Sequence, residues 1–190
     1  MIAEDLSRIA SLASSESSTR RCAATEIFRK GSELIAPILR DWLADSKLAR
    51  CFLFQEARPQ ITVGVAVQPD RFNQILSANG SPRLADVPPD QDAMEFELEF
   101  PGEVRIDVLT TRDRTGRGAI ARYLQRFGEG IQQIEVLVND VDRATELLGA
   151  LFGIEPLYPA TRAGANGSRV NFLLIPLPSG DKVLVELVQT

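Results

Sequence analysis

The sequence predicts an α+β fold in which two βαβββ modules form a pseudo-symmetric mixed sheet, preceded by a small helical N-terminal segment. Three observations lead to this prediction. Apolar residues recur at helical spacing over roughly the first 50 residues. After Pro59 they recur at every second residue, as they do in strands. The strand–helix–strand–strand pattern of residues 61–109 then returns over residues 134–188.

These patterns divide the chain into a helical segment and a domain that contains both modules. The predicted bounds are residues 1–57 for the segment, 58–190 for the domain, and 58–110 and 128–190 for its modules.

The N-terminal segment reads as helices separated by short breaks. A serine-rich stretch, Ser14 to Ser18, interrupts the first apolar stripe. Gly31 is typical of a helix end, and Ser32 is typical of the cap of a following helix. The two helices predicted around Gly31 resemble a single HEAT-type helical pair. One pair cannot form a solenoid, so we expect a helical cap that packs on the rest of the chain.

The first module begins with Ile61–Val67, an alternating strand whose valines predict one buried face. A short helix follows near Phe72. The Pro- and Gly-rich stretch after it, residues 79–89, has only a weak strand pattern at the place of the module's second strand. Met94–Phe100 and Val104–Leu109 then read as a hairpin around Pro101-Gly102-Glu103.

The second module repeats this order. Ile134–Asn139 reads as its first strand, and a helix follows that ends at Gly153. Val170–Ile175 and Val183–Val188 form the closing hairpin, with a turn at Pro178-Ser179-Gly180. In both modules we expect the valines of the first strand to face the core.

Composition excludes several classes of function. The net charge of −5 argues against nucleic acid or an anionic membrane as the main partner. No apolar run approaches the ~18 residues of a membrane span, and the acidic start lacks the basic region of a signal peptide. Cys22 and Cys51 are typical of reduced thiols, so we expect a cytoplasmic protein. The complete absence of histidine excludes imidazole bases, Ser-His and Cys-His pairs, and every histidine-ligated metal site.

Three segments resemble a known family. Residues 119–130 are similar to a linker helix that ends in Gly-Glu-Gly, residues 162–173 to a glycine-rich loop with its strand, and residues 183–188 to a final strand. Together they resemble the vicinal oxygen chelate superfamily, which includes glyoxalase I and the bleomycin-resistance proteins, and most closely its methylmalonyl-CoA epimerase branch. The resemblance implies that the paired modules curl into a cleft that holds one divalent metal and a small organic ligand. A homodimer of this chain is a further expectation.

The metal ligands implied by the resemblance fall on Thr62, Asp107, Gln133 and Glu186. Thr62 and Gln133 stand where relatives carry histidine. A hydroxyl, an amide and two carboxylates suit Mg²⁺ or Ca²⁺ better than Co²⁺, Ni²⁺ or Zn²⁺. We therefore expect no transition metal and no other cofactor, with a weakly bound hard cation as the alternative.

Glu95 falls on the position of the family's catalytic base, which removes the α-proton of the substrate. Glu95, Glu97 and Glu99 share one strand face. Their mutual repulsion would raise the pKa of a carboxyl on that face, and a general base requires a raised pKa. The alternative is an ordinary half-exposed strand, because these glutamates alternate with apolar residues. Asn171, Arg169 and Arg105 are the further candidate ligand-binding residues.

The linker between the modules is rich in arginine. Such a cluster suits the phosphates of an acyl-CoA, or forms a solvated helix face that complements acidic neighbours. The residues concerned are Arg112, Arg114, Arg117, Arg122 and Arg126.

Three functions remain open on the sequence. The first is a glyoxalase-like protein that binds a small organic ligand in the cleft between the modules, without the family's transition metal. The second is an isomerase or lyase similar to methylmalonyl-CoA epimerase, acting on an acyl-CoA or another α-acidic carbonyl compound. The third is a protein-interaction module that uses the helical N-terminus.

Overall fold

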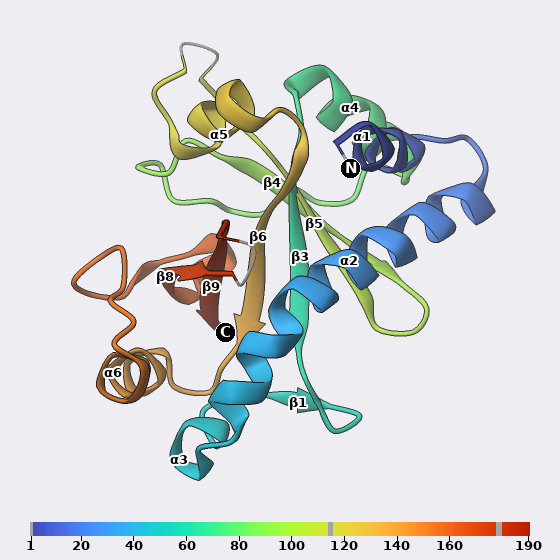
Figure 1. Ribbon diagram of the computed structural model, residues 1–190. Helices are drawn as coiled ribbons and strands as arrows, with labels where there is room; N and C mark the ends of the chain where they lie inside the picture. The colour runs from blue at the N-terminus through green and yellow to red at the C-terminus, as the bar shows by residue number, and fades with distance from the viewer. Residues whose placement is uncertain (1, 114–115, 178–179) are drawn as a thin grey trace. The chain divides into compact units, whose positions relative to one another are not determined.

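The computed structural model describes residues 2–113, 116–177 and 180–190, and it divides into two compact units (Figure 1). The first unit combines Met1–Gly31 with Thr62–Gln132, and the second combines Ser32–Ile61 with Gln133–Thr190. The helical N-terminal segment therefore contributes to both units. The boundary at residue 57, between the helical segment and the domain that contains both modules, stays a prediction.

The N-terminal helices begin and break as predicted, with one exception. The break before Ser17 is present, but the predicted helix end at Gly31 is wrong, because one helix continues through it (Figure 1). A glycine inside a helix costs only about 1 kcal/mol relative to alanine. Burial of Ile27, Ile35 and Trp42 along this helix outweighs that cost. The HEAT-type pair is therefore replaced by one long helix. The helices are α1 (Ile2–Ser11), α2 (Ser17–Leu43) and α3 (Ser46–Ala49).

The first unit contains a mixed sheet in the order β4-β5-β3, with β3 parallel to β5 and β4 antiparallel to β5. The weakly marked strand between α4 and β4 does not form. Only one backbone hydrogen bond, from Ala85 N to Glu95 O at 2.9 Å, joins that segment to β4. Pro82, Pro88 and Pro89 lack the N–H groups that a paired strand would use. The elements are β3 (Ile61–Ala66), α4 (Pro69–Ala78), β4 (Met94–Phe100), β5 (Val104–Thr110) and α5 (Ala119–Phe127).

The alternation of β3 places its valines in the core, as predicted. Val63 and Val65 are fully buried and pair in register with Ile106 and Val108 of β5. Phe72 of α4 packs edge-on against Phe96 of β4, with ring centroids 4.8 Å apart. The other face of this sheet is therefore left to carry the polar side chains.

The second unit contains the complete βαβββ order, with strands arranged β6-β9-β8-β7. Asp140 caps α6 by accepting a hydrogen bond from Arg143 N at 2.9 Å, and Gly153 ends it in the left-handed conformation. Pro178 and Ser179, in the predicted closing turn, lie outside the described residues. The elements are β6 (Gly130–Leu137), α6 (Val141–Phe152), β7 (Arg162–Ala163), the single 3₁₀ turn η1 (Ala165–Gly167), β8 (Arg169–Pro176) and β9 (Lys182–Gln189).

A short hairpin joins α3 to the second unit's sheet. It consists of β1 (Phe54–Gln55) and β2 (Arg58–Pro59). Leu53 N donates to Leu137 O at 2.9 Å, and Phe52 forms an isolated bridge with Val138. These contacts attach this part of the N-terminal segment to β6, as the predicted cap requires.

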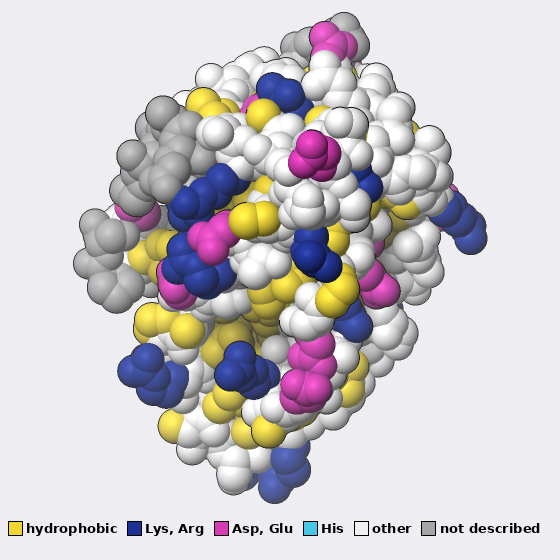
Figure 2. Space-filling view, turned by 90° about the vertical axis from the view of Figure 1, so that its right-hand side faces the viewer, with side chains coloured by type: hydrophobic (Ala, Val, Ile, Leu, Met, Phe, Trp, Pro, Cys, Tyr) yellow, Lys and Arg dark blue, Asp and Glu magenta, His cyan; other side chains and the backbone are white. Residues whose placement is uncertain are grey.

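Charged side chains of both signs occur on the surface. Figure 2 shows acidic and basic side chains interspersed on one face, without a large region of a single charge there. Within the described ranges, no helix is both long and apolar enough to span a bilayer.

Candidate functional site

The polar face of the first unit's sheet brings together several predicted site residues. The register pairs Glu95 with Leu109, Glu97 with Asp107, and Glu99 with Arg105, so these six side chains share one face. Gly64 of β3 pairs with Asp107. Thr62, two residues before Gly64, therefore lies on the same face, and its hydroxyl is 3.4 Å from Glu97 Oε2.

Glu95 is the candidate base. Burial raises the pKa of its carboxyl to about 7, and the nearby Arg112 guanidinium opposes that shift. A carboxyl with this pKa is partly ionised at neutral pH, which is the state a general base requires. The main cause is therefore burial, whereas repulsion among the three glutamates was the cause expected from the sequence.

Glu97 behaves similarly although its side chain is more open to solvent. Burial is the largest cause that raises its pKa, Arg105 opposes it, and Glu99 adds a smaller upward contribution. Arg105 Nε lies 3.7 Å from Glu99 Oε1, so this predicted ligand-binding residue stands beside an exposed carboxylate. Asp107 is almost fully buried, with 6% of its surface exposed.

The second unit holds the other two predicted metal positions, Gln133 and Glu186. The Gln133 amide nitrogen donates to Glu186 Oε2 at 2.7 Å and to Glu135 Oε1 at 3.1 Å. Glu135 and Glu186 are direct partners in the parallel register of β6 and β9. One neutral amide group thus lies between two carboxylates.

Gln133 and Glu186 offer an amide and a carboxylate oxygen, which suit a hard cation better than the family's transition metal. The Gln133 N–H₂ group faces the carboxylates, so its Oε1 is the atom of this side chain that could ligate a cation. Within the described ranges, no group of three or more His, Cys, Asp or Glu side chains lies close enough to hold a metal ion. Imidazole, which favours the later divalent metals, is absent from the whole sequence.

Asn171 and Arg169 lie on the opposite face of the second sheet from Glu186. The register pairs Glu186 with Phe172, so the neighbouring odd-numbered side chains of β8 point the other way. Arg169 Nη2 donates to Asp142 of α6 at 2.5 Å, and Asn171 Nδ2 lies 3.5 Å from Thr145 of the same helix. Strand parity could have separated these two residues from Glu186, and their role in ligand binding stays a prediction.

The described linker arginines make separate local contacts. Arg112 Nη2 lies 3.4 Å from Val87 O, Arg122 Nη1 donates to Arg117 O at 2.6 Å, and Arg126 lies over the Phe127 ring at 4.9 Å. Arg114 lies outside the described residues. Their role as a phosphate cluster also stays a prediction.

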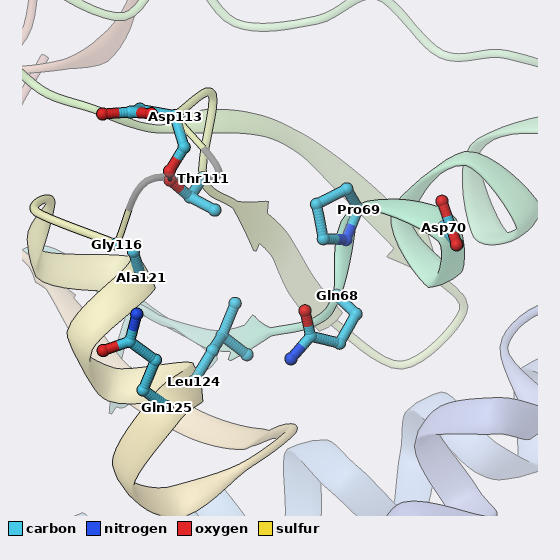
Figure 3. A pocket seen from close by; sticks show the side chains of 9 residues that line it. All are labelled: Gln68, Pro69, Asp70, Thr111, Asp113, Gly116, Ala121, Leu124 and Gln125. Atoms are coloured by element: carbon cyan, nitrogen blue, oxygen red, sulfur yellow. Dashed lines mark hydrogen bonds between the residues drawn. The ribbon is translucent and has the colours of Figure 1, made fainter.

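A cavity of about 380 Å³ lies in the first unit, beyond the ends of β3 and β5, beside the start of α4 and one side of α5 (Figure 3). No pattern in the sequence predicted it, because its walls come from segments that are far apart in the chain and carry no motif. The lining residues are Gln68, Pro69, Asp70, Thr111, Asp113, Gly116, Ala121, Leu124 and Gln125.

Known structures share this fold. The crystal structure of methylmalonyl-CoA epimerase from Mycobacterium tuberculosis is 30% identical, with a TM-score of 0.56 over 74% of this chain and 94% of that one. A methylmalonyl-CoA epimerase in complex with methylmalonyl-CoA and ammonium is 25% identical, with a TM-score of 0.53 over 70% and 94%. A Streptomyces coelicolor epimerase variant in complex with 2-nitronate-propionyl-CoA gives the same identity, TM-score and coverages.

Comparisons of sequence alone are less informative, since neither a protein-family model nor a curated protein matches the chain. The structural matches nevertheless confirm the predicted fold class of paired βαβββ modules with N-terminal helices. The M. tuberculosis enzyme is matched over nearly its whole length at 30% identity. The chain therefore belongs to the methylmalonyl-CoA epimerase family of the vicinal oxygen chelate superfamily.

Proposed function

We propose that this protein binds a small organic ligand of the acyl-CoA class, or a related α-acidic carbonyl compound, without the family's transition metal. Relatives with this fold bind methylmalonyl-CoA and 2-nitronate-propionyl-CoA. The observation that supports the metal-free part is the absence of histidine, whose imidazole favours the later divalent metals, while the Gln133 amide instead donates to Glu186 at 2.7 Å.

The first experiment measures metal content and ligand binding together. Purified protein should contain far less than one equivalent of cobalt, nickel or zinc. Its affinity for methylmalonyl-CoA, measured by calorimetry, should change less than about twofold after dialysis against a chelator, because a metal-free site loses nothing. Stoichiometric metal, or affinity that disappears with the metal, would contradict the proposal.

A substitution tests the amide directly. Gln133→Glu should convert the network with Glu135 and Glu186 into three facing carboxylates, which repel one another and favour a hard cation. We expect millimolar Ca²⁺ or Mg²⁺ to raise the melting temperature of this variant by several degrees, since about 1 kcal/mol corresponds to roughly 2–4 °C in a chain of this size. The wild-type protein and the conservative control Gln132→Glu should not respond. An equal response in the wild-type protein would show that the amide does not replace a cation.

Proton transfer is the second candidate function, and the position of Glu95 favours it. This half-buried carboxyl shares a sheet face with Asp107, and its pKa is raised to about 7. Glu95 would take the α-proton of a bound acyl group while the electron pair of the C–H bond moves toward the thioester carbonyl. Return of a proton to either face of the carbanion would then give exchange or epimerisation.

A further inference from the structure

Three exposed arginines lie along the outer side of α5 in the first unit. Arg122 and Arg126 are one helical turn apart, and Arg122 Nη1 donates to Arg117 O at 2.6 Å. Among the described residues, none of these three guanidiniums makes an ion pair. Residues 116–128 contain no aspartate or glutamate. The three arginines contribute +3 to a chain whose net charge is −5, so the other residues together carry −8.

An exposed aromatic ring ends this row of arginines. Phe127 is 57% exposed, more than any other large hydrophobic side chain that the structure describes. The Arg126 guanidinium lies over its ring, 4.9 Å from the centroid. Arginine and aromatic residues are enriched in protein–protein interfaces, where they often carry most of the binding energy. The basic face, defined as Arg117, Arg122, Arg126 and Phe127, therefore has the composition of an interface.

A membrane surface fits the basic face less well than a protein does. A helix that lies in a bilayer interface must place its apolar side among the lipid chains. The apolar side of α5 is instead packed within the protein, since Ile120, Ala121 and Leu124 are each at most 7% exposed. Phe127 alone would be left to insert, so the helix lacks the apolar surface that interfacial binding requires.

The spacing of the arginines fits several carboxylates better than one phosphate. The guanidiniums of Arg122 and Arg126 make separate contacts, one with a backbone oxygen and one with a ring. They are therefore not directed at one point. The helix Ala119–Phe127 extends over about 12 Å. Carboxylates that recur at every turn of a partner helix lie about 5–6 Å apart, which matches this row.

We propose that the basic face docks an acidic, amphipathic segment of another protein. Its carboxylates would pair with the arginines, and an apolar side chain beside them would cover Phe127. The opposite charges speed the encounter and fix the register of the segment on α5. A face of this length suits a transient complex rather than a permanent one. Docking here requires neither Glu95 nor the Gln133 network, so it is independent of the proposed function.

The probe is a fluorescein-labelled helical peptide of Glu, Ala and Leu, with its glutamates at i, i+4 spacing. Fluorescence anisotropy with the full chain should show binding that weakens severalfold from about 50 to 300 mM NaCl, because salt screens exposed ion pairs. The double variant Arg122→Gln, Arg126→Gln should weaken binding about tenfold. Phe127→Ala should also weaken it severalfold. The matched control, Arg21→Gln with Arg40→Gln, removes the same charge from exposed positions of α2 and should leave the affinity unchanged.

Several results would overturn this assignment. Absence of peptide binding, or an equal loss of affinity in the control pair, would exclude the basic face as the docking site. Equal affinity for a peptide with Lys in place of Glu would show that charge does not direct binding. Displacement of the peptide by coenzyme A, or tighter binding to phosphatidylserine vesicles, would assign the face to phosphates or to lipid. Self-association that the Arg122→Gln, Arg126→Gln variant abolishes would assign it to a second copy of the chain. A thermal melt of each variant checks that the fold is intact.

Discussion

Replacing Glu95 with glutamine should reduce α-proton exchange of methylmalonyl-CoA in D₂O by about 10²–10⁴-fold, the usual contribution of a general base. Glutamine keeps the shape of the side chain but cannot accept the proton. Exchange is measured by NMR or mass spectrometry after subtraction of the uncatalysed rate. Binding of the ligand should persist, which separates loss of chemistry from loss of the site.

The pH dependence follows from the raised pKa of Glu95. The base must be ionised, so wild-type exchange should rise with pH through about 7 and then level off. The Glu95→Gln variant should show no such rise. A wild-type profile that is flat from pH 5 to 9 would contradict the assignment of Glu95 as the base.

The free energy of unfolding is a second measurement, and Glu95→Gln should raise it at high pH although the same variant lowers exchange. The pKa of Glu95 is about 7 in the folded chain against a usual 4.5, so the folded state holds this proton more tightly than the unfolded state. Its contribution to stability is complete below about pH 4.5 and is lost as the pH rises through about 7. Glu95→Gln should therefore be about 1–3 kcal/mol more stable than wild type at pH 8, and no more stable at pH 4.

Glu99→Gln is the matched control for both measurements. Glu99 lies on the same strand face as Glu95, but its side chain is 70% exposed and stands beside Arg105. We expect exchange within about twofold of wild type, and a stability change within the roughly ±0.5 kcal/mol that is usual for surface substitutions. Comparable loss of exchange in both variants would mean that the charge of the face, rather than Glu95, is what matters.

Val136→Asp should unfold the second unit. Val136 is fully buried in β6 and pairs in register with Leu187 of β9. An aspartate there would bury a carboxylate without a partner. This should lower the free energy of unfolding by more than about 4 kcal/mol, a large part of the total for a domain. Circular dichroism and thermal denaturation should show no cooperative melt, and the variant should accumulate in the insoluble fraction.

Leu174→Asp introduces the same side chain on β8, where Leu174 is 42% exposed. Its carboxylate can stay in water, so the variant should fold and lose about 1 kcal/mol or less. A soluble Val136→Asp protein with a normal cooperative melt would show that the register of β6 is wrong.

The sequence by itself determined the strand parity and the repeat. The alternation around Val63, Val65 and Val136 is a local pattern, and it correctly predicted that these valines are buried, although Thr62 and Ala66 on the other face of β3 are buried as well. The absence of histidine is equally a property of the sequence, and it excludes imidazole chemistry whatever the fold. The parity of β8 would also have separated Asn171 from Glu186, because neighbouring residues of a strand point to opposite faces.

Only the tertiary structure decided the chemistry of the candidate sites. Burial of Glu95 depends on the chain packed around it, so its raised pKa has no local signature. The Gln133 amide meets Glu186, 53 residues later in the chain, only because β6 and β9 are parallel neighbours. The continuation of α2 through Gly31 likewise depends on burial that outweighs a local helix-ending preference. The cavity joins Gln68, just before α4, to Gln125, near the end of α5. Contacts between distant segments determine burial, and burial determines charge and reactivity.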